Sequence, residues 1–285
     1  GLAEIAAGAG ELEQAAKWCA KIIEREPQDL KARLFELNIA ERRQDREAVA
    51  AVVQSIRQLD GEGPLWHYGE AVRLRMMAEK EKGSESQLVE ALKHLDAARR
   101  QRPEWAQPVV AAAAIHDGRG DLDKAAEDYV AAVEMGVRVP AVCQRAVLVL
   151  YQRQRFEDAF NLLRRLEAER PDAISELGTV ESELRLRQND LVGALAAARN
   201  TAKDSRRPED HVWLGQMLAT SAAAAQQAGR TEEAGALLQE AEASLRKGLD
   251  LDRNQPASWV TLVRFLALTG KAAEAQKALS EAEQQ

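Results

Sequence analysis

The chain of 285 residues has a formal net charge of -7, and its residues are 46% hydrophobic, 30% charged and only 4% aromatic. This alanine-rich, aromatic-poor composition favours helices over strands. The acidic balance argues against a nucleic-acid-binding protein, because binding to phosphates requires clustered lysine and arginine. No apolar run approaches the roughly 18 residues of a membrane-spanning helix, so we expect a soluble chain without membrane insertion.

A pattern of turns and alanines recurs along the whole chain. From Gly10, Gly120, Gln154 and Gly270, a turn residue is followed by an alanine five positions later and by a larger apolar residue or cysteine four positions beyond that. The same frame returns elsewhere with weaker turns, and successive alanines are 33, 43, 34, 34, 35, 40 and 41 residues apart. In chain order the alanines are Ala15, Ala48, Ala91, Ala125, Ala159, Ala194, Ala234 and Ala275.

Prolines mark where the second helix of a unit should end. Pro27, Pro103 and Pro171 each lie twelve residues after one of these alanines. Proline cannot continue a helix, and it disfavours the helical conformation of the residue before it. Each unit is therefore predicted to be a helix, a turn and a second helix. The long intervals of 43, 40 and 41 residues predict lengthened helices, one of them starting near Pro64 and a pair within residues 209–255.

These marks resemble the tetratricopeptide repeat, a helix-turn-helix unit of about 34 residues. The resemblance implies an all-α fold, a right-handed superhelical α-solenoid of about eight repeats that forms a single domain over residues 1–285. The Leu-Gly pair of the family survives in part as Tyr68-Gly69. The first repeat has a truncated leading helix, so the chain is interpreted as a segment of a longer protein. The predicted repeats span residues 1–29, 30–62, 63–105, 106–139, 140–173, 174–208, 209–255 and 256–285.

In this family the first helix of each pair lines a concave groove, so the resemblance implies that candidate binding residues lie on those helices. Residues at i, i+4 and i+7 share one helix face. That spacing selects a set with aromatic and arginine side chains, which are frequent anchors in protein interfaces. The candidates are Phe35, Arg42, Trp66, Glu70, Arg73, Asp117, Gln144, Tyr151, Arg185, Leu214 and Arg264.

From this set we predict a non-catalytic protein-interaction scaffold whose groove binds a peptide or helix with apolar and acidic side chains. The alternative for each residue is packing between neighbouring helices. Other hypotheses are a recruiting segment of a larger enzyme or assembly, an RNA-reading helical repeat, and an all-α barrel enzyme. Self-association through exposed terminal repeats is a further possibility. The compartment is left open, with the cytoplasm favoured.

No catalytic, cofactor-binding or metal-binding residue is predicted. The histidines lie far apart in the sequence, and none belongs to a His-x-x-x-His or Glu-x-x-His motif. His116 lies next to Asp117, but adjacent helical residues point about 100° apart. Cys19 and Cys143 are too far apart to indicate a disulfide framework or a thiolate site. We therefore expect a protein that is not an enzyme.

The tripeptide Arg119-Gly120-Asp121 has the sequence of a cell-adhesion signal. Gly120, however, occupies the same turn position as Gly10 and Gly270. Glycine readily adopts the positive φ of such a turn, and an aspartate can cap the helix that follows. We interpret the tripeptide as the joint between two helices.

Overall fold

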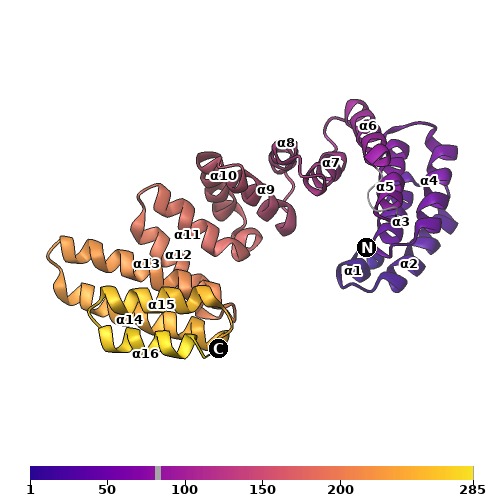
Figure 1. The fold of residues 1–285 in the computed structure, drawn as a ribbon. Helices are drawn as coiled ribbons and strands as arrows, with labels where there is room; N and C mark the ends of the chain where they lie inside the picture. The colour runs from indigo at the N-terminus through magenta and orange to yellow at the C-terminus, as the bar shows by residue number, and fades with distance from the viewer. Residues whose placement is uncertain (81–84, 285) are drawn as a thin grey trace. The chain divides into compact units, whose positions relative to one another are not determined.

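The computed structural model describes residues 1–80 and 85–284, and in these residues it contains sixteen α-helices, one 3-10 helix and no strand. The helices follow one another in pairs, and the turns inside the pairs are short wherever the structure describes them (Figure 1). The chain divides into two compact units, Gly1–Val149 and Leu150–Gln285. The predicted fold class, an all-α array of helix-turn-helix units, is confirmed.

The first unit contains four complete helix pairs and most of a further helix. Their lengths range from 7 residues in the first helix to 17 residues in the third pair. The helices are α1 (Leu2–Gly8), α2 (Leu12–Arg25), α3 (Leu30–Arg42), α4 (Arg46–Asp60), α5 (Pro64–Lys80), α6 (Glu85–Gln101), α7 (Ala106–Gly118), α8 (Leu122–Glu134) and α9 (Pro140–Gln152), of which the last few residues belong to the second unit.

The second unit continues the same alternation, and a 3-10 helix precedes one of its pairs. Its longest helices have 20 and 21 residues. The helices are α10 (Phe156–Glu169), η1 (Pro171–Leu177), α11 (Gly178–Arg187), α12 (Leu191–Lys203), α13 (Pro208–Gln227), α14 (Thr231–Leu251), α15 (Pro256–Leu268) and α16 (Ala272–Ala282).

Among the described residues, each turn inside a pair contains a residue with positive φ, which lets the chain reverse within a few residues. Gly10, Gly120 and Gly270 have φ values of 81°, 75° and 80°, and Gln154 adopts φ 60°. Asp121 then caps α8, where its carboxylate accepts a hydrogen bond from the backbone N–H of Lys124 at 3.5 Å. The interpretation of Arg119-Gly120-Asp121 as a joint between helices is confirmed.

The alanine five positions after each of these turn residues is buried against the partner helix, with Ala15, Ala125 and Ala159 fully covered. The predicted position of this buried residue is wrong by one in the second pair. In the second pair the turn residue with positive φ is Gln44, so the equivalent position is Val49, which is fully buried, and the predicted Ala48 is only partly buried. The misassignment arose because a valine at this position hides the alanine pattern.

The predicted ends and lengths of the helices also agree with the structure. The helices α2, α6 and α10 end two residues before Pro27, Pro103 and Pro171. The long intervals fall on α5, α6, α13 and α14, which have 17, 17, 20 and 21 residues and are the longest helices in the part of the chain described. In the part of the chain that the structure describes, lengthened helices therefore account for the long repeats.

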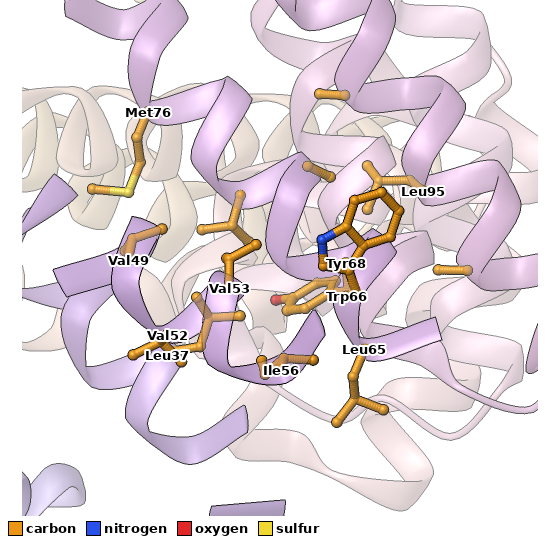
Figure 2. Close-up of a cluster of buried hydrophobic side chains, with 14 of the residues drawn as sticks. Leu37, Val49, Val52, Val53, Ile56, Leu65, Trp66, Tyr68, Met76 and Leu95 are labelled. Carbon is orange, nitrogen blue, oxygen red and sulfur yellow. The ribbon is translucent and has the colours of Figure 1, made fainter. Parts of the chain in front are cut away.

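The core of the first unit lies where α4, α5 and α6 meet, and it is built from large side chains (Figure 2). Leu37, Ile56 and Leu95 are fully buried, and Met76 is 1% exposed. Burying a side chain of this size stabilises a fold by about 1.5–3 kcal/mol. This core fixes α5, which forms one wall of the groove described below.

Among the described helices, none combines the length and the apolar character needed to cross a lipid bilayer.

Candidate functional site

A groove of about 520 Å³ opens in the first unit between α5, α7 and the connection into α9. Its lining is mostly apolar and mostly small. On α5 the lining residues are spaced i, i+3, i+4 and i+7, which is one face of a helix. Residues that line the groove include Ala71, Val72, Val110, Ala114, Val137, Val139 and Val142.

The sequence of α7 explains why the groove is wide. This helix contains four successive alanines from Ala111 to Ala114. Ala112 and Ala113 are buried in the helix packing, whereas Ala111 and Ala114 line the groove. A methyl group fills little volume, so the alanines on the groove side leave space open above the helix. The wall opposite contains Val139, which is 55% exposed and presents an apolar surface to solvent.

Charged side chains occur at one end of the groove. Arg75 lines it, and its guanidinium donates to Glu41 at 2.5 Å and to Glu79 at 2.5 Å. Glu41 and Arg75 line the groove, whereas Glu79 lies outside the lining and contacts the same guanidinium. The three side chains together have an excess of one negative charge. The nearby Tyr68 hydroxyl is neutral at ordinary pH, as tyrosine is in water, and burial raises its pKa further. The groove thus combines an apolar wall with a weakly acidic end.

The predicted candidates on α5 lie outside this groove. The lining stripe of α5 contains Ala71, Val72 and Arg75, whereas the predicted stripe contained Trp66, Glu70 and Arg73. Trp66 is 9% exposed and belongs to the core, so the alternative of packing between helices applies to it. Glu70 and Arg73 form an ion pair with each other at 2.7 Å.

On α7 and α9 the outcome is mixed. Val110 and Ala114, which share the predicted face of Asp117, do line the groove. Asp117 instead accepts two hydrogen bonds from Arg145, each at 2.5 Å, and these lower the pKa of its carboxyl. Gln144, on α9, is partly buried and lies outside the groove lining.

Near the start of the chain, two candidates have structural contacts. Phe35 is partly buried and packs against the small cluster that contains Cys19 and Ile39. The guanidinium of Arg42 donates to the backbone carbonyl of Ala7 at 2.8 Å. Arg42 therefore helps to hold the end of α1, where unsatisfied carbonyls gather.

In the second unit most of the candidates are engaged with other residues. The Tyr151 hydroxyl donates to Glu183. Leu214 is 9% exposed and belongs to a core cluster, so packing between helices applies to it as well. Arg264 is exposed on α15.

Arg185 is held on three sides by acids of the same unit. Its guanidinium lies 2.8 Å from Glu167, 2.8 Å from Glu181 and 3.5 Å from Asp190. Together with the pairing of Arg73 and Glu70, these contacts neutralise two of the arginines that suggested an acidic ligand.

The sequence reasoning missed Arg75, Val137, Val139 and Val142. The available signal was Val137 and Val139, two apolar residues in the connection before α9, which is longer than the described turns inside the pairs. Val139 is 55% exposed there, and clustered exposed apolar residues can mark a binding surface.

Among the described residues, no three His, Cys, Asp or Glu side chains converge as metal ligands. The His116 ring lies 3.1 Å from Asp128 on α8 rather than against its sequence neighbour Asp117. Arg99 donates to the same Asp128 carboxylate at 3.0 Å. These contacts to Asp128 tie α6 and α7 to α8.

Comparison with solved structures shows which known fold this chain shares. The crystal structure of YrrB, a TPR protein with an unusual peptide-binding site, matches with a TM-score of 0.53 at 15% sequence identity, and the match covers 72% of this chain and 95% of YrrB. The fold is a tetratricopeptide-repeat fold.

Two further matches are more distant. The Cut9–Hcn1 hetero-tetramer of APC/C gives a TM-score of 0.49 at 12% identity, over 98% of this chain and 51% of that one. A monomeric mutant of IFIT1 with Gppp-AAAA gives 0.47 at 11% identity, over 99% of this chain and 67% of that one. No family model matches the sequence, and no curated protein matches it either.

Proposed function

We propose that this chain is a non-catalytic scaffold that binds an apolar segment of a partner protein in the groove between α5, α7 and the connection into α9. The observation that carries the proposal is the groove itself, about 520 Å³ in volume and lined mainly by valine and alanine. Val139 is more than half exposed there, and covering it would remove apolar area from water. The peptide-binding site of YrrB, which has the same fold, supports this class of function.

The charge at the groove argues for a partner that is basic rather than acidic. Glu41 and Glu79 both face Arg75, and Arg73 and Arg185 are already paired with carboxylates. A lysine or arginine of the partner would complete the charge balance at Arg75, and an acidic side chain would be repelled. The proposed ligand is therefore an apolar peptide segment with a basic residue at one end.

The test is selection of binding peptides from a random displayed library on the purified chain, followed by measurement of their affinity for two matched variants. Ala114→Trp fills the groove from α7, where Ala114 is exposed. Ala267→Trp places the same side chain on an exposed position of α15. We expect the selected peptides to be apolar with a basic end, and to lose at least about tenfold in affinity, or about 1.4 kcal/mol, for Ala114→Trp alone.

Peptides that bind both tryptophan variants as well as the original chain would place the binding surface elsewhere. Enrichment of acidic peptides that still depend on Ala114 would retain the groove and reject the proposed charge preference.

A further inference from the structure

Two histidines that are 27 residues apart in the sequence meet on one side of the first unit. The Nδ1 atom of His67, on α5, lies 2.9 Å from the Nδ1 atom of His94, on α6. Both side chains are partly exposed, so solvent and small ions reach them. The pair lies outside the peptide groove, and neither histidine lines that groove.

The surroundings hold the two rings in this position. The Trp66 ring packs against both of them, with centroid distances of 4.8 Å to His67 and 5.3 Å to His94. Trp66 is itself buried in the core, so this support is rigid. Burial lowers the pKa of His67, and the charge of His94 acts in the same direction. A neutral imidazole keeps the lone pair that a metal ion requires.

We propose that His67 and His94 form a two-ligand site for a divalent transition-metal ion, with Cu(II) bound most tightly. The 2.9 Å between the two Nδ1 atoms places both ligands within reach of one ion, since metal–imidazole bonds are about 2.0–2.1 Å long. Imidazole nitrogen suits Cu(II), Ni(II) and Zn(II), and a given set of nitrogen ligands binds Cu(II) most tightly of the three.

The metal-bound arrangement differs from the present one by rotation of the rings. The two Nδ1 atoms now face each other, as in an N–H···N hydrogen bond. Because the χ2 well of histidine is broad, ring rotation can turn both lone pairs toward one ion beside the pair. A neutral histidine with its proton on Nδ1 moves that proton to Nε2 and remains neutral.

The charges around the pair decide how strongly a cation is held. The negative charge of Glu62 acts on His67, whereas the positive charge of Arg100 opposes it. The Glu62 carboxylate lies 2.7 Å from Arg57, so it contributes to the local field while it is ion-paired. Since no three metal-ligating side chains converge among the described residues, solvent completes the coordination. The site is therefore an open, exchangeable one.

The position of Trp66 supplies a built-in probe, because a paramagnetic Cu(II) ion close to an indole quenches its fluorescence. The experiment is a titration of the full chain with Cu(II), Ni(II) and Zn(II) in a non-chelating buffer, read by tryptophan fluorescence and by electron paramagnetic resonance. His67→Gln and His94→Gln each remove one ligand, and His116→Gln is the matched control. Trp66→Phe removes the probe and keeps both ligands.

We expect saturable quenching by one Cu(II) ion and a spectrum with two imidazole nitrogens. Loss of either ligand should weaken Cu(II) binding by about 10²-fold, because the second contact of a chelate is intramolecular. His116→Gln should leave the affinity unchanged, and Trp66→Phe should remove most of the quenching without weakening binding. Zn(II) should bind at least tenfold more weakly than Cu(II), about 1.4 kcal/mol.

Equal Cu(II) affinity in His67→Gln, His94→Gln and the original chain would overturn the proposal, and so would a spectrum with fewer than two imidazole nitrogens. Circular dichroism of each variant separates loss of the site from loss of the fold. A glutamine variant that keeps its helical spectrum and still binds Cu(II) as tightly as the original chain would show an adventitious ion only.

Discussion

The hairpins α5–α6 and α13–α14 are both longer than the other pairs, and glycine contributes differently to their packing. In α5–α6 the helices bury large side chains such as Met76 and Leu95, which are 1% and 0% exposed. In α13–α14 the side chains of Leu218 and Leu245 are buried to the same degree, but glycine also lies against the partner helix, with Gly215 of α13 next to Leu245. A long helix pair can thus combine large buried side chains with close approach at glycine.

The first helix of each hairpin contains a buried glycine, Gly69 in α5 and Gly215 in α13, and the two glycines have different neighbours. A Cβ added to Gly69 would lie 2.8 Å from the Val53 methyl group, which belongs to the preceding pair. A Cβ added to Gly215 would lie 2.6 Å from two atoms of Leu245 and 3.2 Å from the backbone oxygen of Ala241, both in its own partner helix. The first glycine therefore serves contact between pairs, and the second serves contact within a pair.

The largest effect is expected from Leu95→Ala in α6. Leu95 is fully buried in the core of the first unit, so its truncation should lower the free energy of unfolding by about 2–5 kcal/mol. Urea unfolding followed by circular dichroism measures this loss. Hydrogen exchange should show it first in α5 and α6, because helix pairs of a repeat array depend on their neighbours.

The matched control for that variant is Leu251→Ala at the end of α14, where the leucine is 41% exposed. A surface substitution of this kind should change the free energy of unfolding by at most about 0.5 kcal/mol. Equal losses in the two variants would contradict a core of large side chains in α5–α6.

The next largest effect is expected from Gly215→Ala. The new methyl group meets a side chain and a backbone oxygen of α14, so the two helices must separate, and overpacking of this kind costs about 1–3 kcal/mol. Gly69→Ala should cost less, because its close neighbour is a single valine methyl group. Urea unfolding of both variants measures the difference. A larger loss for Gly69→Ala would reverse the proposed roles of the two glycines.

The helices themselves could be predicted from the sequence because their signals are local. Pro27 and Pro103 stop helices within a few residues, and Gly120 reverses the chain where φ is 75°. The one-residue error at Ala48 shows the limit of this reasoning. There the turn is made by Gln44, whose positive φ is uncommon for a residue with a side chain.

The binding surface could not be predicted in the same way, because it depends on how each helix is rotated against its neighbours. Trp66 looked like a surface anchor, yet it lies in the core near Leu95, 29 positions further along the chain. Arg185 looked like a free cation, yet its partners include Glu167 on another helix. Such contacts join residues far apart in sequence, and no periodicity within one helix indicates them.

The smallest effect is expected from Gly235→Ala, and its sign distinguishes the two kinds of glycine in α13–α14. Gly235 is exposed in α14, and an added Cβ would meet no atom within 4 Å. Alanine favours a helix interior over glycine by about 0.8–1.0 kcal/mol, so this variant should be more stable than the original chain. The same urea experiment measures the gain.

If Gly235→Ala stabilises the protein while Gly215→Ala destabilises it, the loss at Gly215 comes from contact with α14 and not from a general intolerance of alanine. A loss of stability in Gly235→Ala would instead mean that the first turns of α14 are covered by a neighbour, and the contrast between the two hairpins would then rest on Gly215 alone.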